Sequence, residues 1–323
     1  MPHSIKTRVL PANAAGIDAA ASLLRAGGLA AFPTETVYGL GADATSNEAV
    51  ARIYAAKGRP AFNPLIAHVA SLAAARVEGR FNSDAMKLAE AFWPGPLTLV
   101  VPKTPVSRVC DLARAGLDTL ALRVPAHPVA LALLRAVDIP IAAPSANMSG
   151  RLSPTQARHV AEDLGGEIDL ILDGGPANVG LESTIVACDD LGARLLRPGG
   201  VASADIARVL GRPATIHSGA GVIAPGMLAS HYAPRAAVSL DARSVAPDQA
   251  ALDFGGTLAE FPCVARIDLS PAGELLEAAA ALFGALRSLD ASGATTIAVA
   301  PIPETGLGEA INDRLRRAAA RRE

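Results

Sequence analysis

The spacing of apolar and polar positions predicts alternating helices and strands. Apolar residues recur at helical spacing over residues 14–25, and Gly27-Gly28 ends that helix before an apolar strand at 29–32. Ser46 is a predicted N-cap of a helix that continues to Lys57 and stops at Gly58. Further strands are expected at 65–69, 97–101, 120–124, 139–143, 168–172, 184–187 and 194–196, and further helices at 83–92, 128–136 and 155–164. This pattern predicts one α/β domain over residues 1–211.

The pattern changes after Gly211. Residues 212–235 are rich in Gly, Pro, Ala and Ser and show neither period, which indicates a linker. Beyond the linker, strands are expected at 236–240, 263–268 and 295–300, and amphipathic helices at 271–289 and 307–320. Residues 236–323 therefore read as a second, smaller α/β domain. We expect the charges from Arg314 to Arg322 to form a solvated helix end, which cations favour electrostatically.

A run of hydroxyls, a carboxylate and two glycines follows the strand at 29–32, over residues 33–41. In α/β proteins such strand ends commonly hold ligand-binding groups, because the sheet fixes the side chains and glycine lets backbone N–H groups approach a ligand. The alternative is a structural turn whose hydroxyls cap backbone groups. Both interpretations fit Thr34 and Glu35, for which turn capping is the simpler role.

Lys57 and Arg59 flank a glycine at the predicted end of a helix. Positive side chains there can simply offset the helix dipole, or they can form an anion site in which the guanidinium makes two-point contacts. His68 lies inside a predicted strand, where histidine is usually structural. Its role therefore depends on its neighbours.

Arg123 lies near the end of an otherwise apolar strand and needs an anionic partner, either an internal carboxylate or a ligand. Small hydroxyl and amide side chains gather at residues 144–150, and Thr155 precedes a helix whose N-terminus can face phosphate. Polar side chains also gather at two more predicted strand ends, at residues 182–184 and 197–200. Turn and cap chemistry explains any one of these segments alone.

Composition excludes several classes of protein. The formal charge of -2 gives no global attraction to nucleic acid, although a local basic patch stays possible. No apolar run reaches the roughly 18 to 20 residues of a membrane span, and we expect a cytoplasmic protein. The three cysteines form no CxxC pair and are expected to be small buried residues, and the histidines show no metal-ligand spacing. No Walker A sequence or Ser/His/Asp order is present.

Several separated motifs together resemble a known family. The first region resembles the YrdC-like domain in Pro33-Thr34-Glu35-Thr36-Val37-Tyr38-Gly39-Leu40, Lys57-Gly58-Arg59-Pro60, Asn63-Pro64-Leu65, Pro144-Ser145-Ala146-Asn147 with Ser149-Gly150, and Leu196-Arg197-Pro198-Gly199. The longer, two-domain threonylcarbamoyl-AMP synthases are resembled in Pro225-Gly226-Met227, His231-Tyr232-Ala233-Pro234, Pro303-Glu304-Thr305-Gly306-Leu307-Gly308 and Ala310-Ile311-Asn312-Asp313-Arg314. The resemblance covers essentially the whole chain.

The resemblance implies a twisted mixed sheet in the first domain, a Rossmann-like second domain, and a nucleotidyltransferase. Its reaction joins L-threonine, bicarbonate and ATP into threonylcarbamoyl-AMP and pyrophosphate, the first step toward threonylcarbamoyladenosine at position 37 of tRNAs. L-Threonine would be held by Thr36, His68, Arg123, Ser145 and Ser183, with Arg123 on its carboxylate. ATP would be held by Arg59, Asn63, Thr119, Asn147, Thr155, Arg197 and Tyr232. Lys57 and Arg59 would be the catalytic cations near the phosphates.

The resemblance also implies Mg²⁺ on the triphosphate without a protein cage, and a tRNA-modifying threonylcarbamoyl transferase complex that receives the product. Tyr232 would make the linker a lid, with Gly219, Gly221 and Gly226 as its mobile points. The segment Leu228-Ala229-Ser230 departs from the family, whose members often carry basic residues there.

Two other functions stay open. The first is a double-stranded RNA or tRNA-binding module of the same fold, for which the near-neutral charge predicts only weak binding. The second is a carbamoyl-transfer maturation factor, but such chains carry cysteine-rich zinc segments that this chain lacks.

Overall fold

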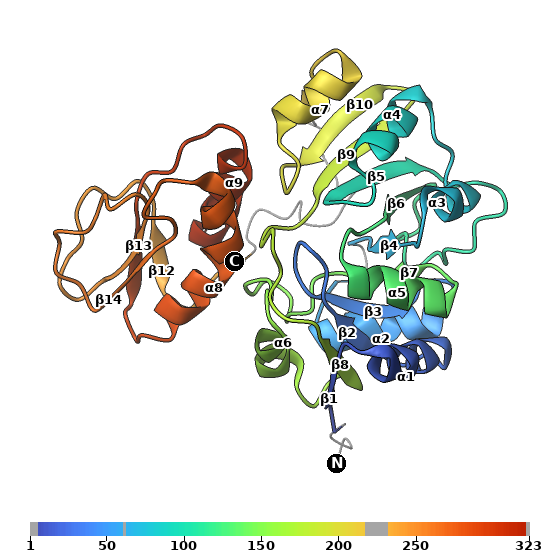
Figure 1. Ribbon diagram of the computed structural model, residues 1–323, viewed down its shortest axis with the longest axis horizontal. Helices are drawn as coiled ribbons and strands as arrows, with labels where there is room; N and C mark the ends of the chain where they lie inside the picture. Colours follow the sequence, from blue (N-terminus) through green and yellow to red (C-terminus); the bar gives the residue numbers. More distant parts are fainter. Residues whose placement is uncertain (1–5, 61–62, 217–231, 321–323) are drawn as a thin grey trace.

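A computed structural model of the protein describes residues 6–60, 63–216 and 232–320 (Figure 1). Within these ranges the strands form two sheets, one of 11 strands in the N-terminal region and one of 4 strands in the C-terminal region. This mixed α/β architecture confirms the predicted fold class. None of the described helices is both long and apolar enough to cross a bilayer.

The large sheet is mixed, with the order β1-β8-β2-β3-β7-β4-β6-β5-β9-β10-β11. Its strands are β1 (Arg8–Pro11), β2 (Ala30–Phe32), β3 (Gly39–Asp43), β4 (Ile66–His68), β5 (Leu97–Pro102), β6 (Thr119–Arg123), β7 (Ile141–Ala142), β8 (Leu170–Asp173), β9 (Thr184–Asp189), β10 (Gly192–Arg197) and β11 (Thr215–Ile216). β4 is parallel to β6, β5 is antiparallel to β6, and β5 is parallel to β9. The ends of β4 and β6 therefore meet the beginning of β9 at one edge.

In the part of the chain that the structure describes, seven helices accompany this sheet: α1 (Ala14–Arg25), α2 (Asn47–Lys57), α3 (Leu72–Glu78), α4 (Ser83–Phe92), α5 (Pro128–Val137), α6 (Ala157–Leu164) and α7 (Ser203–Leu210). The predicted caps of α2 are confirmed. The Ser46 side chain accepts a hydrogen bond from the Ala49 N–H, and Gly58 ends the helix at φ 58°, a conformation that glycine adopts without strain. These caps fix where the Lys57-Gly58-Arg59 segment leaves the helix.

The small sheet is entirely parallel, with the order β12-β15-β13-β14. Its strands are β12 (Ala237–Ser239), β13 (Ala250–Asp253), β14 (Ala265–Asp268) and β15 (Thr296–Val299), and its helices are α8 (Leu275–Asp290) and α9 (Gly308–Ala319). Figure 1 shows α8 and α9 between this sheet and the N-terminal region. The two helices therefore carry the contacts between the regions.

The apolar core of the C-terminal region includes residues from both sides of this boundary. Val37, Leu152 and Leu181 of the N-terminal region belong to the same buried cluster as Leu282 and Phe283 of α8. Gly180 (φ +74°) packs against α8, where an added Cβ would lie 2.4 Å from the Ala279 carbonyl oxygen. The close approach requires glycine at this position, and the two regions share one interior.

Several elements differ from the sequence-based expectations. β1, β3, β13, α3 and α7 were not predicted, and the helix expected at 155–164 begins at Ala157. β11 lies inside the predicted linker, where it pairs with β10. β3 was not predicted because it contains Gly39 and Gly41, and glycine disfavours strands. At Gly41 a Cβ would lie 2.9 Å from Cε1 of Phe32, so this glycine admits a neighbouring side chain rather than a ligand.

Two further expectations need correction. Arg314 was expected at a solvated helix end, yet its relative exposure is 0%. Of the three cysteines, which are free thiols, only Cys188 is buried, and Cys110 and Cys263 are partly exposed. The proposed lid glycines, Gly219, Gly221 and Gly226, lie outside the described residues. The same is true of the family motif at 225–227 and of His231 in the motif at 231–234.

Candidate active site

A small cavity of about 50 Å³ lies where the strand ends of the large sheet meet. All five residues predicted to hold L-threonine line it, together with three of those predicted to hold ATP. These residues are Thr36, His68, Arg123, Ser145 and Ser183, with Arg59, Arg197 and Tyr232. They come from the turn after β2, the ends of β4, β6 and β10, the segments after α2 and β7, the residue before β9, and the linker. The sheet therefore gathers polar groups that are far apart in the sequence.

The turn after β2 is held by the hydroxyl of Thr34. It donates to the Val37 carbonyl at 2.6 Å and accepts from the Thr36 and Val37 N–H groups, both at 3.2 Å. Its single proton is thereby used, so the 2.8 Å contact with the Thr36 hydroxyl has Thr36 as the donor. The predicted capping role of Thr34 is confirmed, and it orients Thr36 toward the cavity.

Arg123 has an internal carboxylate partner, one of the two possibilities that the sequence left open. Its guanidinium donates to Glu35 Oε1 at 2.6 Å, to Thr36 Oγ1 at 2.9 Å and to the Gly95 carbonyl at 3.2 Å. These bonds use three of the five N–H groups of arginine. Two donors are left, and Glu35 holds the group in place. Glu35 is therefore a functional candidate that the capping interpretation missed.

His68 is buried beside this guanidinium. Burial, and secondly the charge of Arg123, lower its pKa to about 3, so the imidazole is neutral near pH 7. Its Nδ1 atom has no hydrogen-bond partner among the described residues. A neutral ring with an unsatisfied nitrogen can exchange one hydrogen bond with a polar substrate group.

Ser183 and Arg197 form a second polar wall. The Ser183 hydroxyl lies 2.7 Å from Thr98 Oγ1, and Arg197 donates to the Ser183 carbonyl at 2.8 Å. Arg197 is buried, and burial lowers its pKa from the ordinary value. The neighbouring Glu182, which also lines the cavity, was noted in the sequence only as part of a polar strand end.

Arg59 is the third cation of the cavity. It donates to the Pro64 carbonyl at 3.1 Å, while its Nε has no partner among the described residues. Burial lowers its pKa to about 10, against the raising influence of Tyr54 and Tyr232. No carboxylate of the described chain forms a salt bridge with it. This environment suits an incoming anion.

Lys57 lies behind the cavity rather than on its surface. Its relative exposure is 1%, and its ammonium donates to the Ser145 carbonyl at 2.6 Å and to the Asn147 carbonyl. Burial, and secondly the nearby Arg59, lower the pKa of Lys57 well below its ordinary value. The geometry gives this lysine a supporting position behind Ser145.

The other residues predicted to hold ATP do not line this cavity. Asn63, Asn147 and Thr155 are buried, and Oδ1 of each asparagine lacks a partner among the described residues. Thr119 begins β6, at the opposite end from Arg123, and the register of β4 with β6 places it near Pro64. An extended ligand would be needed to reach these positions.

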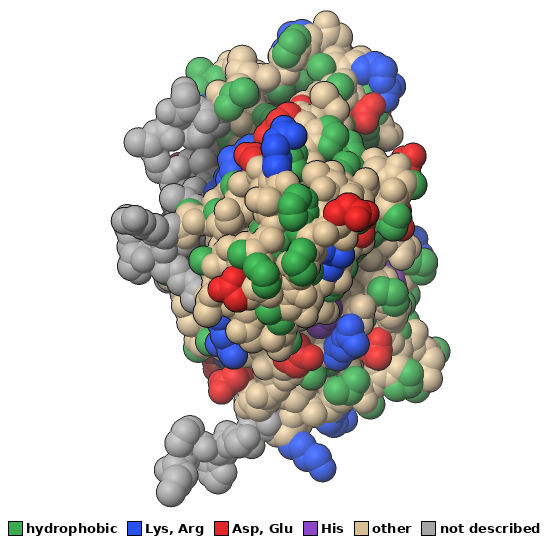
Figure 2. Space-filling model, turned by 90° about the vertical axis from the view of Figure 1, so that its left-hand side faces the viewer, with side chains coloured by type: hydrophobic (Ala, Val, Ile, Leu, Met, Phe, Trp, Pro, Cys, Tyr) green, Lys and Arg blue, Asp and Glu red, His purple; other side chains and the backbone are tan. Residues whose placement is uncertain are grey.

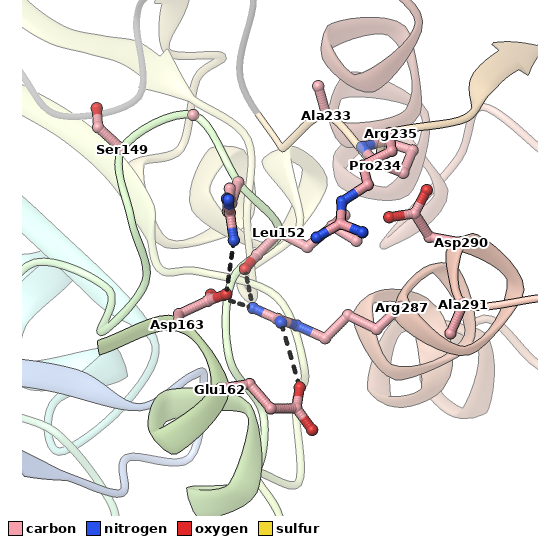
Figure 3. A pocket seen from close by; sticks show the side chains of 12 residues that line it. Ser149, Leu152, Glu162, Asp163, Ala233, Pro234, Arg235, Arg287, Asp290 and Ala291 are labelled. Carbon is pink, nitrogen blue, oxygen red and sulfur yellow. Dashed lines mark hydrogen bonds and ion pairs between the residues drawn. The ribbon is translucent and has the colours of Figure 1, made fainter. Parts of the chain in front are cut away.

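A second, larger cavity of about 590 Å³ lies between the two regions. Figure 3 shows Arg287 extending from α8 toward Asp163 and Glu162 of α6. Arg287 donates to Asp163 Oδ2 and to the Leu152 carbonyl, both at 2.6 Å. None of the residues predicted from the sequence to bind a substrate lines this cavity.

Comparisons with known proteins agree with this arrangement. Residues 22–199 match the Sua5/YciO/YrdC family, described as "Telomere recombination", and residues 201–320 match "Threonylcarbamoyl-AMP synthase, C-terminal domain". The threonylcarbamoyl-AMP synthase of Bacillus subtilis is 43% identical over 98% of this chain and 96% of its own length. That of Pyrococcus abyssi is also 43% identical, over 95% of this chain and 94% of its own length.

Solved structures lead to the same family. The structure of P. abyssi Sua5 complexed with L-threonine superposes with a TM-score of 0.88 at 41% identity, covering 98% of this chain and 97% of that one. Escherichia coli YciO, with a TM-score of 0.54 at 24% identity, covers 60% of this chain and 96% of its own length, and shares the fold of the first region. The chain therefore belongs to the threonylcarbamoyl-AMP synthase family.

Proposed function

We propose that this protein converts L-threonine, bicarbonate and ATP into threonylcarbamoyl-AMP and pyrophosphate, the first step of threonylcarbamoyladenosine synthesis at position 37 of tRNAs. The main observation that supports this proposal is that one cavity is lined by Thr36, His68, Arg123, Ser145 and Ser183 beside Arg59 and Arg197. The small polar groups suit an amino acid, and the two further cations suit the phosphate of the nucleotide with which it reacts.

L-Threonine is assigned to the end of the cavity near Arg123. The two remaining guanidinium N–H groups suit the substrate carboxylate, and Glu35 on the opposite side prevents the arginine from turning away. The neutral His68 and the hydroxyls of Thr36 and Ser183 offer exchangeable hydrogen bonds to the substrate amine and hydroxyl. The site thus recognises both the charge and the hydroxyl of threonine.

The reaction requires positioning more than a protein nucleophile. The threonine amine forms an N–C bond to bicarbonate with loss of water, which gives a carbamate. A carbamate oxygen then attacks the α-phosphorus of ATP in line, and the bond to the β-phosphate oxygen breaks to release pyrophosphate. Arg59 and Arg197 lie where they can offset the phosphate charge, and the buried site strengthens that interaction.

Lys57 contributes to this function through Ser145 and Asn147. By binding both carbonyl oxygens it fixes the segment after β7 from behind the cavity. This supporting role differs from a direct contact between Lys57 and an ATP phosphate. Asn63 and Asn147 would complete the ATP site with their unpartnered amide oxygens once the longer nucleotide extends past the cavity.

Mg²⁺ is assigned to the triphosphate. The described residues contain no group of three His, Cys, Asp or Glu side chains arranged to hold a metal ion. The carboxylates nearest the cavity, Glu35 and Glu182, are already paired with arginines. The donor set therefore suits an ion that arrives with phosphate oxygens, whose charge it would help to neutralise.

The product would pass to a tRNA-modifying transferase complex. The face of the molecule that Figure 2 shows offers no support for direct RNA binding. Figure 2 shows basic and acidic side chains interspersed over the visible face, without a basic stripe that would follow an RNA backbone.

Pyrophosphate release tests the proposed function. The unaltered protein should release pyrophosphate only when threonine, bicarbonate and ATP are all present, and ATP cleavage at the same rate without threonine would contradict the proposal. Arg59→Ala should weaken ATP binding about 10- to 100-fold, because a charge-assisted contact is lost. Arg52→Ala is the matched control, since Arg52 lies on α2 and pairs with Asp169 instead of lining the cavity.

A further inference from the structure

Among the described residues, Arg314 is the largest side chain that is fully buried, although it lies on α9 of the C-terminal region. It crosses the boundary between the regions. Its Nε donates to Glu182 Oε2 at 2.8 Å, and its Nη2 donates to the Pro198 carbonyl at 3.0 Å. Within its own region it donates to Asp313 Oδ2 at 2.5 Å. One guanidinium therefore binds two separate segments of the N-terminal region.

Both of these partners adjoin residues of the candidate active site. Glu182 lines the cavity and precedes Ser183, while Pro198 directly follows Arg197. The segments also bind each other, since the Gly200 N–H donates to the Glu182 carbonyl at 3.1 Å. Glu182 accepts a further hydrogen bond from the Ser153 hydroxyl. Arg314 thus fixes, from behind, the wall that presents Ser183 and Arg197.

The same guanidinium faces the linker residue of the site. The Arg314 Cζ atom lies 5.2 Å from the centroid of the Tyr232 ring, within the range of a cation–π interaction. Tyr232 lines the cavity, is 1% exposed, and packs against Phe283 of α8 at 5.5 Å between ring centroids. Its φ of 61° is unusual for a residue other than glycine, so surrounding contacts must hold it there.

We infer that Arg314 is a positioning residue of the reaction, which holds Tyr232 and the segments carrying Ser183 and Arg197 in the geometry that binds both substrates. The inference rests on the proposed function. Arg314 does not itself line the cavity, so it acts through residues that do. The second region then supplies part of the architecture of the active site.

Arg287 provides a matched control. It is also a mostly buried arginine at the boundary, it also pairs with a buried carboxylate, and it also binds a carbonyl of the N-terminal region (Figure 3). Its partners Leu152, Glu162 and Asp163 do not line the small cavity. Replacing either arginine loosens the boundary, but only Arg314 touches residues that line the candidate active site.

The experiment compares Arg314→Met with Arg287→Met in the full chain, after circular dichroism and gel filtration show that each variant is folded. We expect Arg314→Met to raise the Kd for ATP in calorimetry and the KM for ATP by about tenfold or more, with kcat changed less than about threefold, because ground-state contacts are lost. Arg287→Met should leave both constants within about threefold of the unaltered protein. Equal effects of the two substitutions, or an unchanged ATP affinity in Arg314→Met, would overturn the inference.

Arg314→Lys keeps the test available if the methionine variant does not fold. Lysine retains the charge, but its single ammonium cannot bind Glu182 and Pro198 while also facing the ring. We expect at least about threefold weaker ATP binding, and unchanged affinity would count against the inference. Calorimetric binding does not require turnover, so a lack of threonine-dependent pyrophosphate release by the unaltered protein would refute only the proposed function.

Discussion

Two buried arginine–carboxylate pairs flank the candidate active site, and they differ in the origin of their partners. Arg123 and Glu35 both belong to the N-terminal region, whereas Arg314 reaches Glu182 from the C-terminal region. Each guanidinium donates three hydrogen bonds to protein groups, but Arg123 lines the cavity, whereas Arg314 is fully buried and does not line it. Under the proposed function, similar chemistry therefore serves substrate recognition in one place and assembly of the two regions in the other.

The largest expected effect comes from Arg123→Met. This change leaves Glu35 buried without its partner and should lower the free energy of unfolding by about 3–5 kcal/mol. It should also reduce kcat/KM for threonine by about 100-fold or more, because the substrate carboxylate loses a charged donor. Denaturant titration and pyrophosphate release measure the two effects.

The double variant Glu35→Leu/Arg123→Met sharpens the comparison. Replacing both charges by apolar side chains should recover most of the stability, but not the affinity for threonine. Recovery of threonine affinity would show that Arg123 acts only on the fold.

An intermediate effect is expected from Glu182→Gln, and it depends on pH. Burial alone raises the pKa of Glu182, but Arg314 and Arg197 outweigh burial and lower it to about 2, from an ordinary value of 4.5. A lowered carboxyl pKa stabilises the folded state above pH 4.5, and the contribution is lost as the pH falls from 4.5 through 2. Acid unfolding should therefore be less steep in Glu182→Gln over this interval, as fluorescence against pH would reveal.

The same acid profile in Glu182→Gln and the unaltered protein would contradict this assignment. It would mean that the pair between the regions does not hold Glu182 in its ionised form. The profile above about pH 6.5 provides the internal control, because Glu182 is ionised in both folded and unfolded states there.

The smallest effect is expected from an exposed pair. Arg208 and Asp205 are one helical turn apart on α7, at 2.9 Å, with side chains 72% and 50% exposed. Arg208→Ala should change the unfolding free energy by no more than about 0.5 kcal/mol, since solvent screens such pairs. A larger change in the unfolding free energy, measured by thermal denaturation, would show that burial does not explain why this exposed pair differs from the two buried pairs.

The two pairs also show how far the sequence predicts the site. The need of Arg123 for an anion could be inferred because the residue interrupts an apolar strand. Thr36, His68, Ser145 and Ser183 were assigned from the family resemblance, because turn and cap chemistry explains each polar strand end by itself. The structure brings all four to one cavity. Local signals such as Ser46 and Gly58 likewise fixed the ends of α2.

Other features could not be predicted because their causes are not local. Arg314 belongs to a run of charges typical of a solvated helix end, and its partner Glu182 is 132 residues away. Lys57 likewise bonds to carbonyls some 90 residues away, which turns a helix-end cation into an internal support. β13 consists of Ala-Ala-Leu-Asp, whose alanines give no strand signal, and only pairing with β14 and β15 defines it.

Tyr232 has a thermodynamic consequence for the whole chain. Its ring lines the cavity on one side and belongs to the apolar core of the C-terminal region on the other. A ligand that requires this arrangement binds the native state and not a state in which the C-terminal region has opened. By linkage, such a ligand raises the opening free energy by RT ln(1 + [L]/Kd). Saturation of the active site therefore protects a distant sheet, which contributes no strand to that site, against local unfolding.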